Sequence, residues 1–76
     1  MSESEFRYMT ESIATDLIVM LMEDFDMDMK IAFDKLYNSE TYAKVLDPKT
    51  GLYFQSYGYI YTYLKREVVT GKLSMN

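Results

Sequence analysis

The sequence predicts an all-α protein, a small bundle of about four short helices in a single domain, residues 1–76. Apolar residues recur at helical spacing along most of the chain, and a serine or aspartate able to cap a helix precedes each such segment. The chain is 49% apolar, too rich for disorder, and has no cysteine for a disulfide. The helices are expected at about residues 4–22, 29–38, 40–46 and 56–70.

The first helix is expected to follow a cap at Ser2 or Ser4. Its apolar stripe comprises Phe6, Met9, Ile13, Leu17 and Met20 or Leu21. The apolar run 17–22 makes the end of this helix apolar on every side. Two interpretations follow, either that the second and fourth helices cover this part, or that Ile18 and Met22 form the interface of a homodimer.

The second and third helices are each preceded by a cap. Asp28 is expected to begin a helix whose apolar residues are Met29, Ala32, Phe33, Leu36 and Tyr37. Asn38 can adopt the left-handed conformation that ends a helix. Ser39 would then cap a short helix with a buried side formed by Tyr42, Val45 and Leu46.

The segment 47–51, DPKTG, ends the third helix and predicts a turn, with Gly51 where a positive φ is wanted. The same pattern suits a β-hairpin between residues 43–46 and 52–54, so an α+β fold with a short hairpin around Asp47–Gly51 is the structural alternative. Otherwise residues 51–55 are expected to be an extended connector that places Leu52 and Phe54 in the core.

The fourth segment carries two competing patterns. Tyrosines alternate as in a strand at positions 57, 59, 61 and 63, whereas positions 57, 60, 61, 64 and 68 form one stripe of a helix. Ser56 as N-cap and Gly71 as the C-terminal glycine favour the helix. In a helix, Tyr59, Tyr63 and Arg66 share a second face. That face is either a packing surface or a partner-binding surface, since tyrosine and arginine are enriched at binding hot spots.

The core predicted from these stripes is small. It comprises Phe6, Ile13, Leu17, Leu21, Phe33, Leu36, Tyr42, Leu46, Phe54, Ile60, Leu64 and Val68. A chain of this length buries only about 60% of its unfolded surface, and small proteins without disulfides often gain burial by oligomerising. We therefore expect a homo-oligomer.

The residues that carry most catalytic and metal chemistry are missing. There is no cysteine or histidine, and the three glycines form no phosphate-binding loop. Asp24, Asp26 and Asp28 match the start of a calcium loop, but Met29 stands where the turn needs glycine and Lys35 where a bidentate glutamate is required. We expect a non-enzymatic protein with no catalytic residue, cofactor or metal.

The formal charge of −4 argues against nonspecific binding to nucleic acid. The longest apolar run, Leu17–Met22, is too short to span a bilayer, and residues 2–5 are acidic, unlike a signal peptide. We expect a cytoplasmic protein without membrane contact. The alternative function is a DNA-binding regulator that places the fourth helix in a major groove, with Lys65, Arg66 and Lys72 on phosphates.

Several segments resemble a family of small uncharacterised bacterial proteins. They are residues 25–32, LYNSETY at 36–42, TGLYFQS at 50–56, residues 59–61 and residues 64–67. The family is associated with gene clusters that also carry another short helical protein and an ADP-ribosyltransferase-like, toxin-like protein. The resemblance implies an all-α accessory protein that binds a protein partner, as the regulatory or neutralising member of a toxin–antitoxin-like cluster. It carries over no functional residue.

Overall fold

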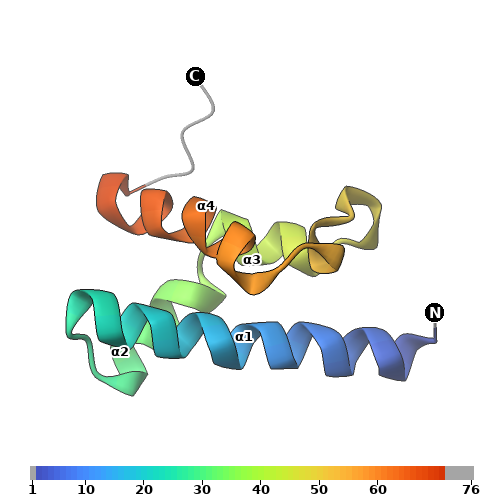
Figure 1. Ribbon diagram of the computed structural model, residues 1–76, viewed down its shortest axis with the longest axis horizontal. Helices are drawn as coiled ribbons and strands as arrows, with labels where there is room; N and C mark the ends of the chain where they lie inside the picture. Colours follow the sequence, from blue (N-terminus) through green and yellow to red (C-terminus); the bar gives the residue numbers. More distant parts are fainter. Residues whose placement is uncertain (1, 72–76) are drawn as a thin grey trace.

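The computed structural model describes residues 2–71, which are helical and contain no strand (Figure 1). The α-helices are α1 (Glu3–Phe25), α2 (Met29–Tyr37), α3 (Glu40–Val45) and α4 (Tyr57–Thr70). Two short 3-10 turns, η1 (Pro48–Thr50) and η2 (Leu52–Phe54), connect α3 to α4. The all-α prediction is confirmed, and the hairpin alternative around Asp47–Gly51 is wrong.

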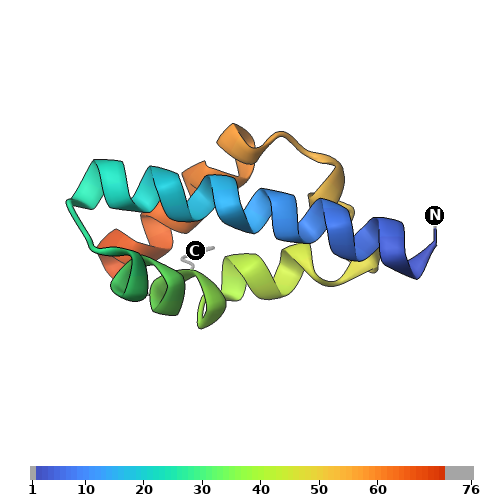
Figure 2. The same ribbon diagram turned by 90° about the horizontal axis from the view of Figure 1, so that it is seen from below.

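The helices pack around α1, the longest of them. Figure 1 shows α1 along one side of the molecule, with α3 and α4 on the other. In the turned view, α2 and α3 follow one another along α1 (Figure 2). The chain then turns through η1 and η2, where the Tyr53 ring meets the Phe6 ring of α1 edge-on at 4.9 Å between centroids.

Each α-helix begins at a cap that the sequence predicts. The side-chain oxygens of Ser2, Asp28, Ser39 and Ser56 accept the backbone N–H of the residue three positions later, at 2.9–3.2 Å. Gly51 and Gly71 have the expected positive φ, 69° and 84°. These signals are local, so the sequence alone locates them.

Two helix ends differ from expectation. Asn38 has φ −98° and ψ 5°, so it does not end α2 in the left-handed conformation. Asp26 adopts that conformation instead, with φ 56°, and α1 continues to Phe25, three residues beyond the expected end. Aspartate tolerates the left-handed region better than most residues, because its short polar side chain can bond locally.

Within residues 2–71, the core is formed by ten buried apolar residues from all four α-helices. They are Ala14, Leu17, Leu21, Ala32, Leu36, Tyr42, Val45, Ile60, Tyr61 and Leu64. Six of the twelve predicted core residues are among them. Phe6, Ile13 and Val68 are half-buried at its margin.

Three predicted core residues lie at the surface: Phe33, Leu46 and Phe54 are 48%, 45% and 68% exposed. Phe33 lies beside the inward face of α2, which Ala32 and Leu36 occupy. Leu46 follows the last turn of α3, beyond Val45. Residues 52–54 form a 3-10 turn rather than an extended connector. In an extended chain, the side chains of residues i and i+2 point to the same side, whereas in a 3-10 turn they point in different directions. Leu52 therefore packs against the core while Phe54 faces solvent.

Leu64→Ala should lower the free energy of unfolding by about 2–5 kcal/mol, because Leu64 is fully buried and alanine leaves a cavity. Leu46→Ala removes the same atoms from a 45% exposed side chain, so it is the matched control and should have a much smaller effect. Urea unfolding followed by far-UV circular dichroism measures both. Equal losses in the two variants would contradict the placement of Leu64 at the centre of the core.

Candidate protein-binding surface

The α4 surface consists of Tyr59, Tyr63 and Arg66, which lie on one face of α4. Ile60 and Leu64 are fully buried and fix the inward side of the helix. Tyr59 is 47% exposed, Tyr63 is half-buried and Arg66 is exposed. The structure thus places the three residues together, beside the face that packs on the core.

The two tyrosines of the α4 surface form a pair. Their hydroxyl oxygens are 3.0 Å apart, within hydrogen-bonding distance, and their rings meet edge-on with centroids 5.4 Å apart and planes at 76°. The hydrogen bond with Tyr63 raises the pKa of Tyr59, because it favours the neutral phenol. The pair therefore presents two rings in mutual contact on one face of α4.

A second group of polar contacts holds the opposite flank of α4 on α1. The Tyr61 hydroxyl donates to Asp24 Oδ2 at 2.7 Å, and Lys65 Nζ lies 3.6 Å from the same oxygen. The Tyr61 hydrogen bond, and then the Lys65 charge, lower the pKa of Asp24. Lys65, one of the cations expected to contact phosphates in the DNA-binding alternative, is therefore paired within the protein. Lys72 lies outside the described residues.

Glu67 of α4 makes contacts that the sequence analysis does not anticipate. Its Oε2 accepts the Glu40 backbone N–H at 2.7 Å, and its Oε1 accepts the Thr41 N–H at 3.0 Å and the Thr41 hydroxyl at 2.8 Å. It thus caps the N-terminus of α3, where backbone N–H groups lack partners in the helix and the dipole favours an anion. The residues are 26 and 27 positions apart, and no local pattern in the sequence signals the contact.

The aspartates of the calcium-like motif have separate structural roles. Asp24 bonds to Tyr61, Asp26 ends α1 and Asp28 caps α2. Over residues 2–71, no group of three or more metal-ligating side chains is arranged to hold an ion. Nor is any helix in the same range long and apolar enough to cross a membrane.

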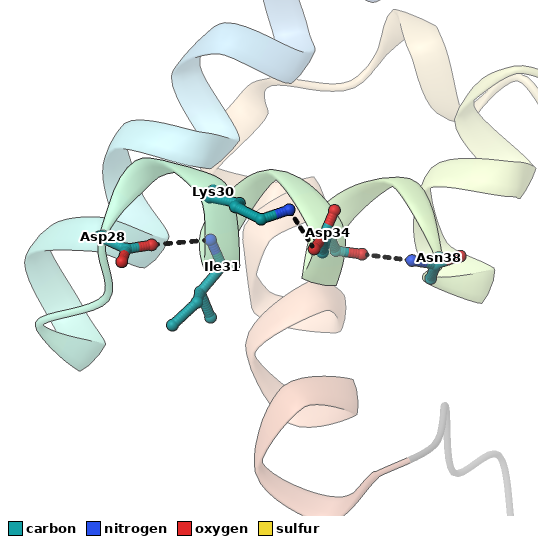
Figure 3. A network of polar contacts seen from close by, with 5 residues as sticks. All are labelled: Asp28, Lys30, Ile31, Asp34 and Asn38. Atoms are coloured by element: carbon teal, nitrogen blue, oxygen red, sulfur yellow. Dashed lines mark hydrogen bonds and ion pairs between the residues drawn. The ribbon is translucent and has the colours of Figure 1, made fainter.

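A shallow groove of about 450 Å³ lies between α2 and the end of α4. It is lined by Ile31, Asp34, Lys35, Asn38, Ser39, Glu67, Val68 and Gly71. Several of its polar groups have partners: Lys30 lies 3.9 Å from the Asp34 carboxylate, and Asn38 Nδ2 donates to the Asp34 carbonyl at 2.9 Å (Figure 3). Both carboxylate oxygens of Glu67 accept hydrogen bonds from backbone N–H groups of α3.

Comparisons of the chain with protein-family models, with curated proteins and with solved structures found no match. The function is therefore inferred from the geometry of this chain.

Glu67→Ala should destabilise the protein by about 1–3 kcal/mol, because it removes the acceptor of three hydrogen bonds at the start of α3. Glu67→Gln keeps one acceptor oxygen and should lose less. Ser12→Ala, at an exposed position of α1, is the control and should change stability by no more than about 0.5 kcal/mol. Urea unfolding measures all three; a neutral Glu67→Ala would show that the cap contributes nothing to stability.

Stability should also fall at alkaline pH. Burial raises the pKa of Tyr42, and burial together with the bond to Asp24 raises that of Tyr61. The unfolded chain releases these protons near pH 10, while the folded chain keeps them. The stabilisation is therefore complete below about pH 10 and is lost as pH rises through the raised pKa values.

The test is urea unfolding from about pH 8 to about pH 11. The Tyr42→Phe and Tyr61→Phe double variant should lose less stability over this range than the wild type. Tyr8→Phe, which removes the hydroxyl of a 76% exposed ring, controls for the loss of a phenol. If stability falls equally with pH in the double variant and in the wild type, Tyr42 and Tyr61 are not the source of the alkaline loss.

Proposed function

We propose that this protein is a non-enzymatic accessory module that binds a protein partner through the α4 surface. The observation that carries the proposal is the contact between Tyr59, which is 47% exposed, and the half-buried Tyr63, beside the exposed Arg66. Ile60, Tyr61 and Leu64 already pack α4 on the core, so the pair adds aromatic area beyond what the fold requires.

The chemistry of the α4 surface suits an interface that stays soluble when free. Tyrosine combines a large apolar ring with a polar tip, and arginine offers a planar set of donors for a carboxylate. Within residues 2–71, no acidic side chain lies within 4.0 Å of the Arg66 guanidinium, the distance that defines the ion pairs of Lys30 and Lys65. The partner that fits is a protein surface with an apolar depression beside an acidic group.

The same geometry favours a partner-binding role over catalysis. Ser2, Ser39 and Ser56, three of the hydroxyls able to act as nucleophiles, cap helices. The carboxylates of Asp24 and Glu67 bond to neighbouring helices. These groups are engaged in holding the fold.

The resemblance to the bacterial family supplies a more specific form of the proposal. The partner would be the ADP-ribosyltransferase-like protein of the same gene cluster, and this chain would regulate or neutralise it in the cytoplasm. The acidic charge of −4 is compatible with a basic partner surface and less suited to DNA.

The test replaces Tyr59 and Tyr63 with serine and measures the dissociation constant for the cluster partner by titration calorimetry. Each substitution should cost about 2 kcal/mol of binding, the loss typical of a hot spot, while the fold survives. Tyr57→Ser is the matched control, because Tyr57 is 49% exposed on the same helix but lies off the α4 surface. Its binding should equal that of the wild type.

Two outcomes would contradict the proposal. One is a loss of stability with unchanged binding per folded molecule, which would make the tyrosines a packing surface. The other is an equal loss of binding in Tyr57→Ser. Tight, salt-sensitive binding of duplex DNA would instead favour the regulator function.

A further inference from the structure

The outer side of α2 carries an apolar stripe that the fold leaves uncovered. Met29, Phe33 and Tyr37 lie on consecutive turns and are 64%, 48% and 44% exposed, while Ala32 and Leu36 are fully buried. The rings of Phe33 and Tyr37 stack with centroids 4.3 Å apart. The stripe is therefore exposed, and two of its three side chains are in contact.

This stripe runs beside one face of α1. The Tyr37 ring meets the Tyr42 ring edge-on at 5.0 Å, and the Tyr42 hydroxyl donates to the Thr10 carbonyl at 3.2 Å. At the other end, only residues 26–28 separate α1 from α2, so Met29 lies near the end of α1. The stripe thus extends from the end of α1 back towards Thr10.

The face of α1 beside the stripe carries Ile18 and Met22. Both follow Glu11, the neighbour of Thr10, at helical spacings of 7 and 11 positions, so they share its face. The hydrogen bond between Asp24 and Tyr61 places the opposite flank of α1 against α4, so the face with Ile18 and Met22 lies on the side of α2. Ile18 and Met22 are half-buried and pack against the core. Together with the stripe they form one α1–α2 surface: Ile18, Met22, Met29, Phe33 and Tyr37.

We propose that the α1–α2 surface binds a second copy of this chain, with the two-fold axis parallel to α1 and α2. The homodimer interface expected at Ile18 and Met22 thus extends onto α2. An apolar stripe that the fold leaves exposed marks an interaction site, and a protein whose described residues 2–71 hold ten buried apolar side chains gains burial by covering it.

Charge at the borders of the surface selects this arrangement. Glu23 follows Met22 on the α1 border. Lys30 follows Met29 on the α2 border at the same end; its side chain is 85% exposed and lies 3.9 Å from the exposed Asp34 carboxylate, so it remains accessible to a second acid. An axis parallel to the helices lays α1 of one copy on α2 of the other, so Glu23 meets the partner's Lys30 twice. An axis across the helices would set α1 against α1 in opposite directions and bring Glu23 towards the partner's Glu11, acid against acid. The parallel axis makes the surface self-complementary, as a two-fold interface requires.

The experiment is sedimentation equilibrium of the full chain over a dilution series. The wild type should show reversible dimerisation, and Phe33→Glu should weaken it at least about tenfold, because a charge would be buried without a partner. Met29→Glu, at a 64% exposed position, provides a second variant if Phe33→Glu fails to fold. Phe54→Glu, at another exposed phenylalanine, is the matched control and should dimerise like the wild type.

Charge reversal tests the axis. Glu23→Lys and Lys30→Glu should each weaken the dimer, and the double variant should restore it. A wild type that stays monomeric, or a dimer that survives both Phe33→Glu and Met29→Glu, would overturn the proposal. If each single reversal weakens the dimer and the double variant does not restore it, the parallel axis is wrong. Tyr59→Ser leaves the α1–α2 surface intact and should dimerise normally, which separates this proposal from the function of the α4 surface.

Discussion

The contact on which the arrangement of α3 and α4 depends is the Glu67 carboxylate at the start of α3. A six-residue helix is too short to be stable alone, and its first N–H groups need acceptors. Ser39 Oγ accepts from Tyr42, and Glu67 accepts from Glu40 and Thr41. Every free amide in the first turn therefore has a partner, and most of the acceptors come from a helix distant in sequence.

This cap also fixes α4. Glu67 holds one flank of the helix on α3, while Tyr61 and Lys65 hold the other flank on Asp24 of α1. Between these flanks Ile60 and Leu64 are fully buried. A helix held in this way has little freedom to rotate about its axis, so the side that carries Tyr59 is left outward. The exposure of the α4 surface is thus a consequence of polar contacts elsewhere on α4.

The sequence predicted the features that depend on neighbouring residues and missed those that depend on distant ones. The serine and aspartate caps and the positive φ at Gly51 and Gly71 were all predicted, because each is decided within a turn of chain. Phe33 and Phe54 were misplaced, since a stripe shows which side of a segment is apolar but not how much of it a neighbour covers. The Glu67 contact was missed because carboxylates that bond across the fold and those that face solvent look alike in a sequence. The grouping of Tyr59, Tyr63 and Arg66 followed from helical periodicity alone.

The two surfaces differ in chemistry, and the difference suits different occupants. The α4 surface combines hydroxyl-tipped rings with a guanidinium, groups that remain hydrated in the free protein. The α1–α2 surface is dominated by methionine, isoleucine and phenylalanine, which gain most from lasting removal from water. On the proposed axis a dimer would carry two α4 surfaces related by symmetry. Such a dimer could engage two sites on one partner, and its avidity would exceed the affinity of a single surface only if the spacing of those sites matched the dimer.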